Sequence, residues 1–160
     1  MNYRLIIITL LLVSTCMGNA QEPTRFGIKG GANFTFFSVN EGSFGSSVTN
    51  ETGFFIGAFS DIALTKQLSF QPEVLYIGLN DFKFLNIPLY AKYKVVKSFN
   101  IMVGPSLNYF FDFFSDRLKI GFDLSTVYEL TNRFNLNVKF ALGINEIAPN
   151  GLFLGVGYYL

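Results

Sequence analysis

From residue 25 onward, apolar residues recur at every second position in a series of short segments. In the segment 134–144, for example, apolar Leu136 and Val138 alternate with polar Asn137 and Lys139. A period of two places successive side chains on opposite faces of a β-strand. The pattern therefore predicts strands that have a different environment on each face. No apolar run after the N-terminal segment approaches the length of a membrane-spanning helix.

The alternation divides the chain into eight expected strands, which are 25–37, 53–64, 68–77, 84–95, 99–111, 118–130, 134–144 and 151–160. Where a segment carries more than one charge, the charges share a face, as Lys119, Asp123 and Glu129 do. In 53–64 and 68–77 both faces are largely apolar, so the sequence defines the register of these two strands only weakly.

The connections between these segments alternate in length. A long polar stretch, 38–52, comes first, and looser loops also follow the third, fifth and seventh segments, whereas the second, fourth and sixth end in tight turns at 65–67, 96–98 and 131–133. Outer membrane barrels have short periplasmic turns and longer external loops, and their strands are of about ten residues. The predicted fold class is therefore all-β, an eight-stranded antiparallel up-and-down transmembrane β-barrel after a cleaved signal peptide.

The N-terminal segment 1–20 has the features of a secretory signal peptide. Arg4 precedes an apolar run over 5–13, and small residues follow it. We expect cleavage between Ala20 and Gln21. The run is too short for a membrane helix, which needs about 20 apolar residues.

Lipidation at Cys16 is a second alternative for this segment, but Thr15 stands where a smaller residue is usual. Cleavage after residue 20 removes the chain's single Cys and leaves an outer membrane β-barrel domain over 21–160. This domain has equal numbers of basic and acidic residues, because the signal contains one Arg and no acid.

Backbone polar groups inside a bilayer must pair within the protein, so a sheet in lipid has to close into a barrel. With eight strands the lumen is just wide enough for side chains to fill it. Unpaired buried charges are costly, so we expect the inward charges to neutralise one another and form a polar plug. The predicted interior network consists of Lys29, Asp61, Glu73, Lys92, Lys119, Asp123, Glu129 and Lys139.

Prolines and aromatic residues refine this prediction. Pro72, Pro88 and Pro105 fall within expected strands, where each removes a ladder hydrogen bond, so we expect bulges there.

Aromatic residues cluster near strand ends, which favours two interfacial girdles over the packed core of a soluble barrel. The girdle candidates are Phe36, Phe37, Phe54, Phe55, Tyr109, Phe110, Phe111, Phe113 and Phe114 near the loops, and Phe70, Phe99, Tyr128 and Phe134 near the tight turns.

Successive segments FGIKGGANF, GFFIGAF, LSFQPEVLY, LNIPLYAKY and IMVGPSLNYFF resemble the PorT-like outer membrane β-barrel family of Bacteroidota. The most specific pieces are the runs around Pro72, Pro88 and Pro105, so the resemblance implies that these prolines are features of the fold. The C-terminus also resembles an outer membrane assembly signal, carried by Gly155, Tyr158 and Leu160. The implied partners are outer membrane lipid and the assembly machinery.

Composition limits the possible functions. The chain has no His, which removes imidazole bases and His metal ligands, and its net charge of +1 argues against a nucleic-acid partner. We predict no catalytic site, no cofactor and no metal site, although a lipid enzyme without His remains an alternative.

The predicted function is that of a non-enzymatic barrel in the cell outer membrane with a structural, adhesive or accessory role, exerted through the loop 38–52. A secreted lipocalin-like barrel that binds a small apolar ligand is one alternative, because periodicity alone does not tell inside from outside. A narrow pore is another. The sequence names no protein partner and no ligand.

Overall fold

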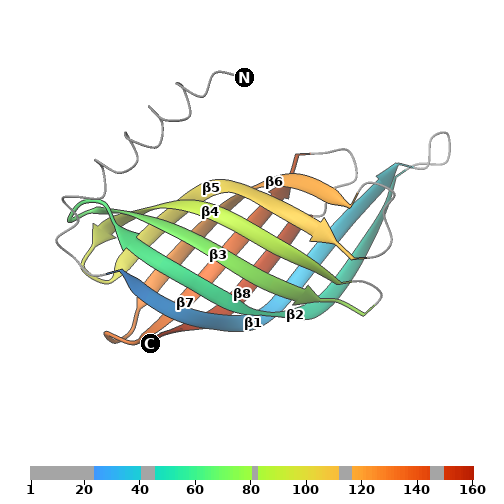
Figure 1. Ribbon diagram of the computed structural model, residues 1–160. Coiled ribbons are helices and arrows are strands. Elements are labelled where there is room, and N and C mark those ends of the chain that lie inside the picture. Colours follow the sequence, from blue (N-terminus) through green and yellow to red (C-terminus); the bar gives the residue numbers. More distant parts are fainter. Residues whose placement is uncertain (1–23, 41–45, 81–82, 112–116, 145–149) are drawn as a thin grey trace, which may run out of the picture.

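A computed structural model describes residues 24–40, 46–80, 83–111, 117–144 and 150–160. The strands are β1 (Arg25–Asn40), β2 (Ser46–Ala63), β3 (Leu68–Gly78), β4 (Lys83–Val96), β5 (Phe99–Phe110), β6 (Leu118–Glu129), β7 (Phe134–Gly143) and β8 (Asn150–Tyr159). Each strand pairs antiparallel with the next, and β8 pairs with β1 to close the barrel (Figure 1). The predicted fold class is thus confirmed, while the expected signal peptide lies outside the described residues.

The two faces of the wall differ as the alternation predicts. In β7, Asn135, Asn137 and Lys139 are buried in the lumen, whereas Leu136 and Val138 face outward and are exposed. This arrangement is the reverse of the one that a soluble lipocalin-like carrier requires, because the apolar face is on the outside. The described residues include no helix of the length and apolar character needed to cross a membrane.

The predicted long loop 38–52 is wrong, because most of it continues the first two strands. β1 runs to Asn40 and β2 starts at Ser46, and the two strands stay paired throughout. β1 pairs with β8 only as far as Phe36, and β2 pairs with β3 only from Phe54 onward. The hairpin therefore extends beyond the barrel wall as a two-stranded ribbon (Figure 1). The Val and Thr residues of this polar stretch favour strand, and antiparallel pairing needs no apolar face to continue.

The bulges predicted at the prolines are also wrong. The register is the same on both sides of each proline, as the facing pairs show: Pro72–Leu89 and then Leu75–Asn86, Pro88–Ser106 and then Ala91–Val103, and Pro105–Phe122 within an unbroken ladder. Among the described strand pairs, the register shifts only between Lys94 and Val96 of β4. A proline removes one ladder hydrogen bond, but it does not require an extra residue in the strand. Gly104, which directly precedes Pro105, lies close to the neighbouring strand, and a Cβ added to it would come 1.9 Å from the Leu89 carbonyl oxygen.

Most of the described girdle candidates lie at strand ends with their rings on the outer surface. Phe36, Phe54 and Tyr109 are exposed near the loops, and Phe70, Tyr128 and Phe134 are exposed near the tight turns. Phe99 and Phe111 are half-buried. The prediction is wrong for Phe55 and Phe110, which are buried inside the lumen. The side chain of Phe37 and all of Phe113 and Phe114 lie outside what the structure describes.

Candidate functional site

The middle of the lumen holds two buried ion pairs, each of which joins residues of different strands. The ammonium of Lys29 on β1 lies 2.8 Å from both carboxylate oxygens of Glu73 on β3. The side-chain amide of Gln71 donates a further hydrogen bond to the Glu73 carboxylate, also at 2.8 Å. Both charged side chains are almost fully buried. The carboxylate is therefore compensated by a cation and by a neutral donor, as a buried charge requires.

The second pair joins Lys139 on β7 to Asp123 on β6, with 3.3 Å between the ammonium and a carboxylate oxygen. Lys139 also donates to the side-chain oxygen of Asn86 at 2.5 Å. Asp123 accepts hydrogen bonds from the hydroxyls of Ser106 at 2.7 Å and Tyr90 at 3.3 Å. The pair thus belongs to a hydrogen-bonded network that includes residues of strands β4 to β7.

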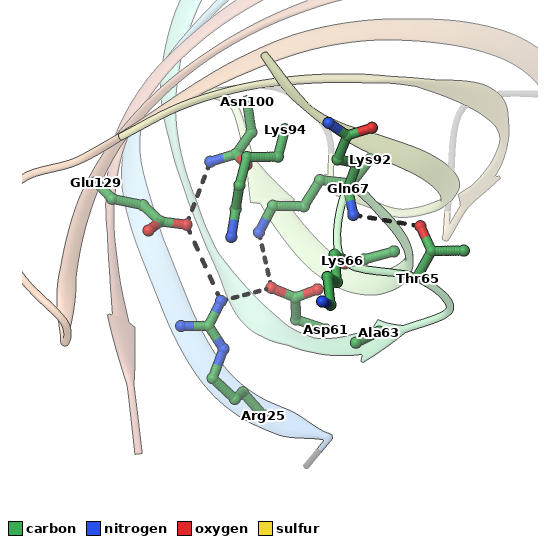
Figure 2. Close-up of a pocket in the computed structure, with 11 residues that line it drawn as sticks. Arg25, Asp61, Ala63, Thr65, Lys66, Gln67, Lys92, Lys94, Asn100 and Glu129 are labelled. Atoms are coloured by element: carbon green, nitrogen blue, oxygen red, sulfur yellow. Dashed lines mark hydrogen bonds and ion pairs between the residues drawn. The ribbon is translucent and has the colours of Figure 1, made fainter. Parts of the chain in front are cut away.

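A third cluster lies at the end of the lumen formed by the tight turns (Figure 2). One carboxylate oxygen of Asp61 accepts from Lys92 at 2.7 Å, from Arg25 at 3.0 Å and from the Tyr159 hydroxyl at 3.3 Å. Glu129 accepts from the amide of Asn100 at 3.2 Å and lies 4.0 Å from Arg25. We call this pocket the turn-end mouth, and it is lined by Arg25, Asp61, Ala63, Thr65, Lys66, Gln67, Ser69, Lys92, Lys94, Asn100 and Glu129.

Of the eight residues expected in the interior, six form the three pairs Lys29–Glu73, Lys92–Asp61 and Lys139–Asp123. Glu129 is at the mouth and partly exposed, and Lys119 is half-buried near the loop end of β6, opposite Asn108. Sequence reasoning missed Arg25 as part of the cluster around Asp61. The signal was available, since Arg25 shares the inward face of its strand with Lys29.

The loop half of the lumen combines apolar and polar side chains, because a buried apolar cluster lies there beside Asn33, Thr35, Asn86 and Asn108. The sequence prediction of a polar interior did not include this apolar cluster. The apolar cluster consists of Phe55, Leu75, Ile77, Leu79, Phe84, Phe110 and Phe153. The rings of Phe55 and Phe153 meet edge to face at 5.5 Å, and those of Phe84 and Phe110 stack at 4.6 Å. This cluster explains why the segments 53–64 and 68–77 are apolar on both faces, because their inward residues pack here.

Between the two ends, fully buried side chains that include Tyr90, Met102 and Lys139 occupy the lumen. Buried charged, polar and apolar side chains along the lumen favour a plugged barrel over a narrow pore. The described residues contain no group of three or more His, Cys, Asp or Glu side chains that could hold a metal ion. The interior side chains neutralise one another's charge and connect the strands of the barrel wall. The turn-end mouth is accessible to solutes.

Comparison with known proteins gives a likeness at the level of fold. No family model and no curated protein sequence matches the chain. A de novo designed transmembrane β-barrel superposes with a TM-score of 0.60 at 14% identity, over 88% of this chain and 99% of that one. Ail, the attachment invasion locus protein of Yersinia pestis, superposes with a TM-score of 0.55 at 12% identity, over 87% of this chain and 100% of that one.

Neisserial surface protein A gives a TM-score of 0.53 at 19% identity, over 86% of this chain and 99% of that one. These structures cover nearly the whole described barrel. The fold is that of an eight-stranded transmembrane β-barrel.

The buried pairs lead to a test by substitution. Glu73→Ala leaves the Lys29 ammonium buried without its carboxylate, so we expect a loss of about 3–5 kcal/mol in the free energy of unfolding. Lys66→Ala, at an exposed turn position, should change it by less than about 0.5 kcal/mol. Denaturant unfolding of the refolded barrel in detergent measures both, and equal stability of Glu73→Ala and the parent would contradict the pairing.

Proposed function

We propose that this protein is a small, non-enzymatic integral barrel of the cell outer membrane. The observation that carries the proposal is the outer surface of the wall, where large apolar side chains are exposed on every strand. They include Ile28, Ile56, Val74, Leu89, Val103, Leu107, Ile120, Leu124, Val138, Phe140, Leu154 and Val156. Soluble monomers rarely expose contiguous apolar patches beyond a few hundred Å². Hydrocarbon removes this surface from water, and the likeness to transmembrane barrels supports the same conclusion.

The route to that membrane forms part of the proposal. A signal peptide over 1–20, cleaved between Ala20 and Gln21, delivers the barrel domain 21–160 across the inner membrane. The assembly machinery then recognises the C-terminal strand through Gly155, Tyr158 and Leu160. The Gly-x-x-Tyr-x-Leu spacing of the last strand supports this proposal. Membership of the PorT-like family of Bacteroidota rests on the proline-containing sequence runs alone.

The position of the hairpin β1–β2 supports a structural or adhesive role exerted on the loop side of the barrel. The ribbon continues past the last pairing of β1 with β8 and of β2 with β3, so its outer backbone edges have no neighbouring strand within the described residues. Ail, one of the structural neighbours, is an attachment protein by its name. The filled lumen gives no support to a transport function.

The membrane location is tested by placing a charge on the outer wall. Val138 lies in the middle of β7 and points outward, so Val138→Arg should destabilise the barrel in lipid vesicles by about 2–4 kcal/mol. Leu130→Arg is the matched control beside the tight turn, where the cost is about 0–1 kcal/mol. Denaturant unfolding from vesicles measures both variants. Equal effects at the two sites would show that the wall does not cross a hydrocarbon layer.

The adhesive role is tested by shortening the hairpin. Phe37 and Thr49 face each other in the ribbon, so an Asn-Gly turn can replace residues 38–48 without changing the barrel register. We expect the shortened chain to fold, as shown by heat-modifiable gel migration, and the adherence of expressing bacteria to host cells or matrix to fall to background. The unshortened chain at equal surface abundance is the control. Undiminished adherence of the shortened variant would contradict this role.

A further inference from the structure

The turn-end mouth carries more positive charge than its own carboxylates can neutralise. Four cationic side chains line it, Arg25, Lys66, Lys92 and Lys94, against the two carboxylates of Asp61 and Glu129. The mouth is open to solvent, and apart from Ala63 its remaining lining residues are polar. The excess of two positive charges is therefore a property of a single pocket and not of a dispersed surface.

Both carboxylates are already in use. Asp61 is shared by Lys92 and Arg25 through a single oxygen atom. Glu129 lies 4.0 Å from Arg25 and accepts a hydrogen bond from Asn100. The two remaining cations, at positions 66 and 94, form no ion pair within the described part of the chain.

These two unpaired lysines reach the mouth from different elements. Lys94 follows Lys92 by two residues on β4, so both side chains leave the same face of the strand. Figure 2 shows the Lys94 side chain directed into the mouth beside Lys92. Lys66 belongs to the turn between β2 and β3, where the Thr65 hydroxyl accepts from the backbone N–H groups of Gln67 at 3.2 Å and Leu68 at 2.9 Å. The second lysine is thus held on a braced turn.

Arg25 has N–H donors beyond the one that it gives to Asp61. Its Nη2 atom contacts Asp61, and its guanidinium lies 4.1 Å over the ring of Tyr159. A guanidinium has five N–H donors, so this fixed group still presents donors to the mouth. The amides of Asn100 and Gln67 add neutral donors to the lining.

We propose that the turn-end mouth binds one phosphate group, as the head group of an anionic phospholipid or as a free phosphate compound. Two unpaired ammonium groups match the charge of a phosphate dianion, whose terminal oxygens can accept from several donors at once. A phosphodiester head group carries one negative charge, and its two non-bridging oxygens can accept from the same donors. Lys66 and Lys94 are the main ligands, and Arg25 is oriented by Asp61 and Tyr159 to complete the site. The exposed rings of Phe70 and Tyr93 lie nearby on the outer wall, at the level where lipid head groups meet the barrel.

The test uses the full chain without its signal, refolded in maltoside micelles that contain no phosphate. Inorganic phosphate is titrated at constant ionic strength, and binding is followed by amide NMR shifts of Ser69, Lys94 and Asn100. We expect one saturable site. Lys66→Gln with Lys94→Gln should weaken it by about tenfold or more, since each lost contact is charge-assisted.

Lys97→Gln is the matched control, because it removes the same charge from the turn after β4 but lies outside the mouth. Heat-modifiable migration of every variant verifies that the barrel is folded. A non-saturable response, or the same loss in Lys97→Gln as in the double variant, overturns the proposal.

A second arm distinguishes the sources of the phosphate. Phosphatidylglycerol is added to the micelles during the titration. Competition with inorganic phosphate assigns the site to a lipid head group, and its absence assigns the site to a soluble phosphate compound. The inference is independent of the proposed function: a barrel that inserts into vesicles but gives no saturable phosphate binding overturns the inference alone.

Discussion

The pairing of β8 with β1 is the interaction on which the rest of the structure depends. It runs from Gly27 opposite Tyr159 to Phe36 opposite Asn150 and converts an open sheet into a cylinder. In hydrocarbon an unpaired strand edge would leave backbone N–H and C=O groups without partners, at a cost of several kcal/mol for each group. Closure removes both edges, and it alone allows the outer face to be uniformly apolar.

Closure also creates an interior from which most water is excluded, so the inward side chains must satisfy one another. The chain does this by ion pairing and by apolar packing. Lys29, Lys92 and Lys139 each pair with a carboxylate on another strand. Toward the loops, an aromatic and aliphatic cluster packs beside hydrogen-bonded polar side chains such as Asn86 and Asn108. These side chains together fill the lumen, and Lys66 and Lys94, which form no ion pair within the described residues, lie at the turn-end mouth, where water can solvate them.

The sequence predicts the strand number, the antiparallel order and the faces of β5 to β7, because each has a clean period of two. It does not predict which lysine meets which acid, since partners depend on register across several strands and alternation gives only the face. The sequence pattern places Phe55 and Phe110 on the outside, because an inward apolar residue has the same appearance in sequence as an outward one. The sequence does not predict the ribbon beyond Phe36, because its polar composition resembles that of a loop.

The central claim is that hydrocarbon contacts the apolar outer wall. Nuclear Overhauser effects between lipid acyl-chain protons and backbone amides, measured on the perdeuterated barrel in bicelles, test it most directly. The account predicts acyl-chain contacts at outward positions in the middle of the strands, such as Val103, Leu124 and Val156, and water contacts at the tight turns. Water contacts at the mid-strand positions, without acyl-chain contacts, would contradict it.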